Sequence, residues 1–187
     1  MDDLVKKGEL SDADRIKVLD ELENVAEVKL LRHEPKIIIG KYSKRSFDIN
    51  NCGGEILNLN WKNIQITNEG INVVKMHISR FDDILANRKM INRLEKIINK
   101  EIKITDYDKR FYSHEIREFE RYKKLGLENV SQKDIPNQVK VWNDTHTATL
   151  EDYKINEYNN DGVRNLYHPQ VEDIDFFSDE ERKLLEL

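Results

Sequence analysis

Apolar residues recur at helical spacing over most of the second half of the chain. Runs that repeat every three to four positions are typical of helices with one face on a core. Four such runs carry Ile71, Val74 and Ile78; Met90, Leu94 and Ile98; Phe111, Ile116 and Phe119; and Trp142, Leu150 and Tyr153. We therefore expect four core helices. Shorter helices are predicted over residues 11–27 and from Ser178 onward.

Polar residues mark where these helices begin and end. Thr67 and Thr105 each precede an apolar run and can accept a hydrogen bond from the first helical turn. Gly126 is expected to end the third core helix, Glu128–Pro136 to form a loop, and Asn159–Gly162 to form a turn. The fourth core helix is predicted over residues 138–153.

The pattern differs before residue 67, where short runs of β-favouring residues alternate with Gly and Asn. The runs are residues 36–39, 46–49, 55–59 and 64–66, and they predict a small antiparallel sheet. The expected fold class is α+β, mainly α with a small N-terminal β element and about four core helices. We divide the chain into an N-terminal segment, residues 1–60, and a helical domain, residues 61–187.

Composition narrows the class of protein. The chain has 187 residues, 38% hydrophobic and 36% charged, which is polar for a globular protein but long enough to bury a core. The single cysteine, Cys52, excludes an intramolecular disulfide and a multi-cysteine zinc site. No run of about 18 apolar residues occurs and the N-terminus does not resemble a signal peptide, so we expect a soluble segment without stable membrane insertion.

Charge is unevenly distributed along the chain. The net charge is −5, yet residues 61–125 hold 15 Lys and Arg against 10 Asp and Glu. This basic middle could present a cationic face to a phosphate backbone. It could equally consist of solvated helix surfaces, and the sequence leaves both interpretations open.

The third core helix carries the most informative polar residues. On a helical wheel His114, Glu115 and Glu118 share the face formed by the aromatic residues around Phe111. A purely structural stripe would not normally include two carboxylates, because burying unpaired charge is costly. The pattern indicates a half-buried polar site with acid–base potential. Pairing of these residues with arginines on neighbouring helices is the structural alternative.

Further histidines lie in comparable settings. His146 is one turn from Trp142 and from Leu150, on an apolar face, and His77 lies near Val74 and Phe81. A lone histidine in such a place is usually a core residue, but several on separate helices make a convergent cluster plausible. His168 lies before Pro169, in a rigid loop that could close over a site.

Two mechanisms can use these residues. In metal-independent RNA cleavage, His114 and His146 would act as acid and base and Glu118 would orient an imidazole. Arg117 or Arg121 would then lie near the phosphate. In the metal alternative, His114, Glu118 and His146 would bind zinc or another divalent ion and Glu115 would be the base. The H-E-x-x-E pattern is a weaker signal than H-E-x-x-H.

The order of several motifs resembles a toxin domain found at the C-termini of bacterial polymorphic toxins of the Rhs, contact-dependent-inhibition and wall-associated types. The matching stretch covers residues 64–171. The motifs are residues 66–71, His77 with Arg80-Phe81, Asn87 to Leu94, residues 111–115, Thr145-His146 with Leu150, and Tyr167-His168-Pro169.

This resemblance implies an effector that is delivered as part of a larger secreted or cell-surface protein and acts in the cytoplasm of a neighbouring bacterium. It implies a cognate immunity protein as partner and, in many members, nuclease activity with tRNA a frequent substrate. The resemblance implies catalytic roles for His114, Glu115, His146 and His168. Glu118, Glu120 and Arg121 lie where this chain departs from the family's pattern. Our candidates for substrate binding are Arg80, Arg117 and Arg121. A metal-dependent DNase or peptidase, and a non-enzymatic immunity or binding protein, are the alternatives.

Overall fold

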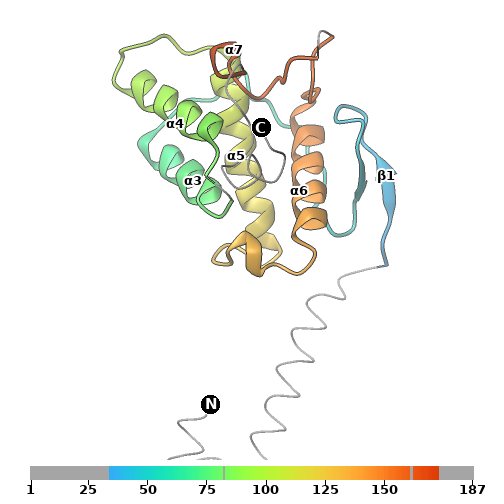
Figure 1. Ribbon diagram of the computed structural model, residues 1–187. Coiled ribbons are helices and arrows are strands. Elements are labelled where there is room, and N and C mark those ends of the chain that lie inside the picture. The colour runs from blue at the N-terminus through green and yellow to red at the C-terminus, as the bar shows by residue number, and fades with distance from the viewer. Residues whose placement is uncertain (1–33, 82, 161, 173–187) are drawn as a thin grey trace, which may run out of the picture. The chain divides into compact units, whose positions relative to one another are not determined.

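A computed structural model describes residues 34–81, 83–160 and 162–172 (Figure 1). All the described elements belong to one compact unit, which begins at Lys36. This unit therefore begins well before residue 61, where we expected the helical domain to start. The predicted helices over residues 11–27 and from Ser178 onward lie outside the described residues.

The described elements are mostly helical, and the expected α+β class with a helical core is confirmed. They are β1 (Ile37–Ile39), β2 (Ser46–Asp48), α3 (Asn68–Ile78), α4 (Leu85–Ile98), α5 (Asp106–Lys124), the 3-10 turn η1 (Gln132–Asp134), α6 (Gln138–Tyr153) and α7 (Pro169–Glu172). Helix α5 contacts α3 and α4 as well as α6, and it lies between them (Figure 1). Among the described helices, none is long and apolar enough to cross a membrane.

The helix boundaries follow the capping residues that the sequence indicated. Thr67 caps α3 by accepting a hydrogen bond from the Gly70 N–H at 3.0 Å. Thr105 and Asp108 form a reciprocal capping box at the start of α5. The main core cluster then joins α3, α4, α5 and α7 through their apolar faces. It comprises Ile71, Val74, Ala86, Met90, Leu94, Phe111, Tyr112 and Val171.

The first two predicted strands are confirmed as an antiparallel pair, with Ile38 opposite Phe47. Phe47 is buried in a second cluster with Cys52 and with Ala148 of α6, so the hairpin is covered by a helix on one side. This packing explains why the compact unit includes residues 36–60.

The other two predicted strands are wrong. Residues 55–59 and 64–66 have no strand partner within the described part of the chain. The Leu57 and Leu59 N–H groups donate to Asp152 at the end of α6, at 2.5 and 2.8 Å. Ile64 and Ile66 pack on the main core cluster. The β-favouring residues in these segments therefore lie in an extended connection. Its backbone N–H groups at Leu57 and Leu59 donate to the end of α6 and not to a neighbouring strand.

Candidate functional site

Three helices bring five ionisable side chains together in the interior. Helix α5 supplies His114, Glu115 and Glu118, α6 supplies His146, and α3 supplies His77. Positions 114 and 118 are one turn apart, so both side chains leave the same face of α5 toward α6. None of the five is more than 9% exposed. We call these residues the His/Glu cluster.

One carboxylate oxygen forms the centre of the His/Glu cluster. Glu118 Oε2 lies 3.1 Å from His114 Nε2, 3.6 Å from His77 Nε2 and 3.7 Å from His146 Nδ1. His114 Nε2 and His146 Nδ1 are 2.9 Å apart. The other carboxylate oxygen, Oε1, is 3.2 Å from the hydroxyl of Thr145, which can donate to it. The sequence predicted the pairing of His114 with Glu118 and the approach of His146.

Burial and contacts lower the pKa values of three members of the cluster, His114, His77 and Glu118. Burial lowers the pKa of His114 to about 4 and also lowers the pKa of His77. Burial acts to raise the pKa of Glu118, but the contacts with three imidazoles outweigh it and hold that pKa well below its usual range. At neutral pH the centre is therefore an ionised carboxylate beside the uncharged imidazoles of His114 and His77, and its contacts with these two residues are not ion pairs between full charges.

Glu115 behaves differently from its neighbour on α5. Its Oε2 lies 3.9 Å from His77 Nε2. Burial and then the negative charge of Glu118 raise its pKa well above its usual range. Two carboxyl groups three positions apart on one helix thus differ in protonation, which is the arrangement that separates acid and base roles in a catalytic site.

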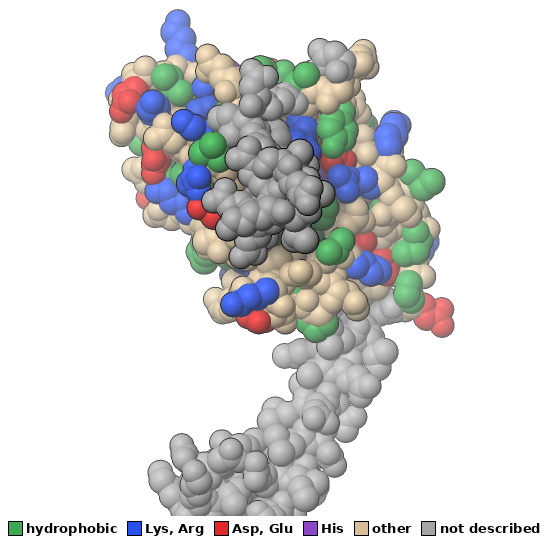
Figure 2. All heavy atoms as spheres, in the orientation of Figure 1, with side chains coloured by type: hydrophobic (Ala, Val, Ile, Leu, Met, Phe, Trp, Pro, Cys, Tyr) green, Lys and Arg blue, Asp and Glu red, His purple; other side chains and the backbone are tan. Residues whose placement is uncertain are grey.

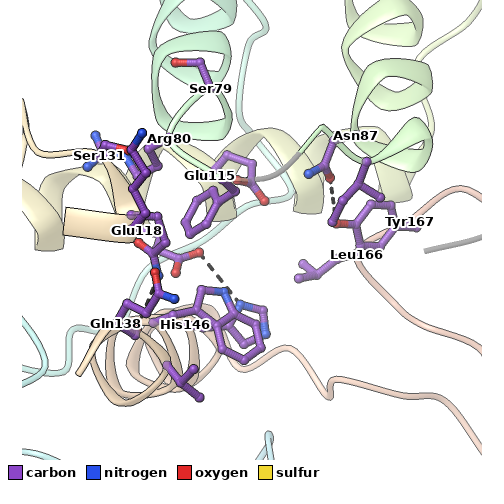
Figure 3. Close-up of a pocket in the computed structure, with 16 residues that line it drawn as sticks. Ser79, Arg80, Asn87, Glu115, Glu118, Ser131, Gln138, His146, Leu166 and Tyr167 are labelled. Carbon is purple, nitrogen blue, oxygen red and sulfur yellow. Dashed lines mark hydrogen bonds and ion pairs between the residues drawn. The ribbon is translucent and has the colours of Figure 1, made fainter. Parts of the chain in front are cut away.

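A pocket of about 620 Å³ opens beside the cluster. Glu115, Glu118 and His146 line it, whereas His77 and His114 do not (Figure 3). The remaining lining residues come from the ends of α3 and α4, the segment around η1, the start of α6 and the segment before α7. They are Ser79, Arg80, Phe81, Ile84, Asn87, Ser131, Gln132, Lys133, Gln138, Val139, Trp142, Leu166 and Tyr167. A ligand in this pocket would meet two carboxyl groups and one imidazole directly.

Arg80 is the one predicted substrate-binding arginine that reaches the pocket. Its guanidinium donates to the backbone oxygens of His77, Leu127 and Glu128 at 3.1, 2.9 and 3.1 Å. It also lies over the Tyr122 ring, 4.9 Å from the ring centroid. These contacts hold a positively charged side chain of the pocket lining in one orientation.

Arg117 and Arg121 are not among the residues that line the pocket, contrary to our expectation for substrate binding. Asp152 of α6 is fully buried and accepts from both guanidinium groups, at 2.7 Å each. Arg121 further donates to the backbone oxygens of Cys52 and Gly54, at 2.9 and 3.0 Å. Their charge neutralises a buried carboxylate that fastens α5 to α6 and to the segment after β2, which is a structural role.

His168 is likewise separate from the His/Glu cluster. Its ring packs edge-on against Tyr107, with centroids 5.8 Å apart, and its Nδ1 accepts from the Gln170 N–H at 3.2 Å. The preceding Tyr167 donates to Asn87 Oδ1 at 2.8 Å. The Tyr-His-Pro segment therefore meets the pocket through Tyr167, and the predicted role of His168 in the chemistry has no geometric support.

Trp142 is a pocket residue to which sequence reasoning gave no role. Its ring stacks on His146, with centroids 5.0 Å apart and planes inclined by 23°. The Arg45 guanidinium lies over the Trp142 ring at 5.3 Å and is bound to Glu157 at 2.6 Å. Trp142 lies one helical turn before His146, and this spacing is the sequence signal that could have identified it as a pocket residue. His77 was noticed but assigned no function, because its partners come from other helices.

Two sets of cluster residues could each hold a metal ion: His114, Glu118 and His146, and His77, Glu115 and Glu118. Glu118 belongs to both. Comparisons with family models, curated proteins and solved structures give no match.

Proposed function

We propose that this chain is the effector domain of an antibacterial toxin and that it cleaves phosphodiester bonds in RNA, with tRNA the first substrate to test. The observation that supports cleavage chemistry is that Glu115, Glu118, His146 and Arg80 all line one pocket. Cleavage of a phosphodiester needs groups that move protons and a positive charge near the phosphate. The pocket supplies both kinds of group.

The division of labour follows from burial. His114 is fully buried and does not line the pocket, so it can act on a substrate only through His146 or Glu118. Glu115 has a raised pKa and can exchange a proton closer to neutral pH than an ordinary carboxyl group. We therefore no longer assign the acid and base roles to the two histidines alone. Glu115 takes one of these two roles.

The charge and size of the pocket favour a nucleic acid substrate. Lys133 joins Arg80 in the lining, and a volume of about 620 Å³ is within the usual range for sites that take one nucleotide-sized ligand. On the part of the surface visible in Figure 2, Lys and Arg side chains are interspersed with acidic ones rather than gathered in one basic patch. On this face, therefore, no broad basic patch is seen that would attract a phosphate backbone.

The proposed route of delivery and the proposed neutralising partner both rest on the resemblance to polymorphic toxins. It supports an effector carried by a larger exported protein into the cytoplasm of a target bacterium. A cognate immunity protein would protect the producing cell, and blocking the pocket is the simplest way for it to do so.

The direct test is tightly regulated expression in a bacterial cytosol of the wild type and of Glu118→Gln. Glu95→Gln is the matched control, because Glu95 pairs with Lys75 at the surface of α4. We expect growth arrest and discrete tRNA fragments on a denaturing gel for the wild type and the control, and neither for Glu118→Gln. Growth arrest with intact RNA and fragmented chromosomal DNA would indicate that the substrate is DNA and not RNA. Normal growth with all three proteins at equal levels would contradict the proposal.

A further inference from the structure

We propose that His114, His146 and Glu118 together bind one divalent transition-metal ion, with zinc as the ion to test first. Two of these ligands come from one turn of α5, and the third faces them from α6. The sequence left a metal site and a metal-independent site open, and the geometry of the three side chains favours the metal site. Use of the ion in RNA cleavage rests on the function proposed above, whereas binding of the ion does not.

The three ligand atoms lie around one common point. His114 Nε2 is 3.1 Å from Glu118 Oε2 and 2.9 Å from His146 Nδ1, and the remaining side of this triangle, from His146 Nδ1 to Glu118 Oε2, is 3.7 Å. A triangle with these sides has a centre about 1.9 Å from every corner, and zinc bonds to nitrogen and oxygen are roughly 2.0–2.2 Å long. An ion slightly outside the plane of the three atoms therefore reaches all of them at bonding distance.

Hydrogen bonds alone do not account for these close contacts. Seen from His114 Nε2, the oxygen of Glu118 and the nitrogen of His146 are about 76° apart, whereas a good hydrogen bond has an angle above about 150° at the hydrogen. A hydrogen on Nε2 can therefore serve only one of the two partners well. If His146 donates to Nε2 instead, the lone pair of Nε2 also faces the carboxylate oxygen. A cation at the common point would bind lone pairs of all three atoms and remove this conflict.

Neighbouring side chains hold the ligands of this site in place. The Thr145 hydroxyl lies 3.2 Å from Glu118 Oε1 and can donate to it, which leaves Oε2 to the imidazoles. Trp142 stacks on the His146 ring, with centroids 5.0 Å apart. Contacts of this kind orient metal ligands in proteins. Two imidazoles and one carboxylate are also a ligand set of catalytic zinc and of non-haem iron.

His77 and Glu115 lie outside the ligand set. Their possible ligand atoms group with Glu118 but not with His114 and His146. His77 Nε2 is 3.6 Å from Glu118 Oε2 and 3.9 Å from Glu115 Oε2. We therefore expect His77 to affect the ion only as a neighbour of Glu118.

The pocket gives such an ion access to substrate. Glu118 and His146 line the pocket, so a water molecule or a phosphate oxygen can complete the coordination from that side. Catalytic zinc sites keep one position open in the same way, beside three protein ligands. The ion would add a second positive charge to that of Arg80 in the pocket lining, and a cation that polarises a phosphoryl oxygen stabilises the charge that develops during cleavage. The chemical class of ligand expected at the open position is therefore a phosphodiester.

The test measures zinc binding by the full chain and makes no use of cleavage. Glu115→Gln is the background, because it keeps all three ligands, disrupts the other possible ligand set and should lower the toxicity of the protein. After metal has been removed with a chelator, we expect one zinc per chain by calorimetry and elemental analysis, and a visible absorption band with cobalt. His146→Ala in this background should bind zinc more than about 100-fold more weakly, a greater loss than the roughly 10–100-fold typical of an outer-shell partner.

His77→Ala and His168→Ala in the same background are the matched controls. Each removes one imidazole, the first beside Glu118 and the second against Tyr107 outside the cluster. His77→Ala should weaken zinc binding by less than about 100-fold, and His168→Ala should leave it unchanged. If His146→Ala does not fold by circular dichroism, His146→Gln takes its place.

Four results would each overturn the three-ligand site. They are no bound zinc, two zinc ions per chain, unchanged zinc affinity of a folded His146 variant, and a loss of affinity with folded His77→Ala as large as with His146→Ala. If zinc binds as expected but the expression test described above shows no RNA cleavage, the proposed function alone is contradicted.

Discussion

The chemistry of Glu118 depends on how its neighbours are protonated. It is an ionised carboxylate whose contacts are with imidazoles, two of which have lowered pKa values. Removing one member of the His/Glu cluster therefore changes the proton equilibria of the others. Single substitutions here should alter pH dependence as well as activity.

Acid should destabilise the metal-free protein through His114. Burial lowers its pKa from 6.5 to about 4, so the unfolded chain binds a proton that the folded chain does not between these pH values. The contribution of the neutral His114 imidazole to the free energy of unfolding is therefore fully present above pH 6.5 and is lost as the pH falls toward 4. We expect the wild type to lose about 2 kcal/mol more than His114→Gln between pH 7 and pH 5, measured by urea unfolding with chelator present. If the free energies of unfolding of the two proteins fell in parallel with pH, this prediction would be contradicted.

Glu115→Gln should separate activity from stability. Since the raised pKa of Glu115 favours its neutral form, an amide of the same shape should change the free energy of unfolding by less than about 1 kcal/mol. RNA cleavage should fall by at least about 100-fold, because the amide cannot transfer a proton. Chemical denaturation and a fluorescent RNA assay measure the two effects. A loss of activity that follows a loss of folding would refute the catalytic role.

At the scale of elements, Asp152 joins α5 to α6. Asp152→Asn removes the charge that Arg117 and Arg121 share, both through fully buried contacts. Arg121 would lose the carboxylate it contacts and Arg117 would keep only the more exposed Glu120, which should cost about 3–5 kcal/mol. Urea unfolding would show this loss, and Lys75→Ala, at an exposed ion pair with Glu95, should change stability by less than about 1 kcal/mol. Equal effects of the two substitutions would disprove the structural role of the arginines.

The elements that could be predicted are those defined by neighbouring residues. Thr67 and Thr105 mark helix starts because a cap involves only three or four positions, and the pairing of His114 with Glu118 follows from one helical turn. Residues 55–59 were misassigned because their hydrogen-bond partner, Asp152, lies nearly a hundred positions away. Arg117 and Arg121 were assigned to substrate because the same distant carboxylate could not be recognised as their partner.

At the scale of the whole molecule, the compact unit begins at Lys36. A chain that starts at residue 36 should therefore retain cooperative unfolding and RNA cleavage. One that starts at residue 61 loses Phe47 and Cys52 from the cluster on α6 and the acceptors of Arg121, and it should unfold well below the first. Calorimetry of the two shortened chains decides this, and equal melting temperatures would place the boundary at residue 61 instead.

Because Trp142 stacks on His146, the fluorescence of this tryptophan should report changes at the imidazole. The chain's only other tryptophan, Trp61, lies outside the pocket lining, beneath the Arg110 guanidinium. Emission from the indole against His146 should respond when that imidazole changes its charge or its ligand, while emission from Trp61 stays constant. A Trp61→Phe chain would then report occupancy of the pocket in real time, without a label and without a known substrate.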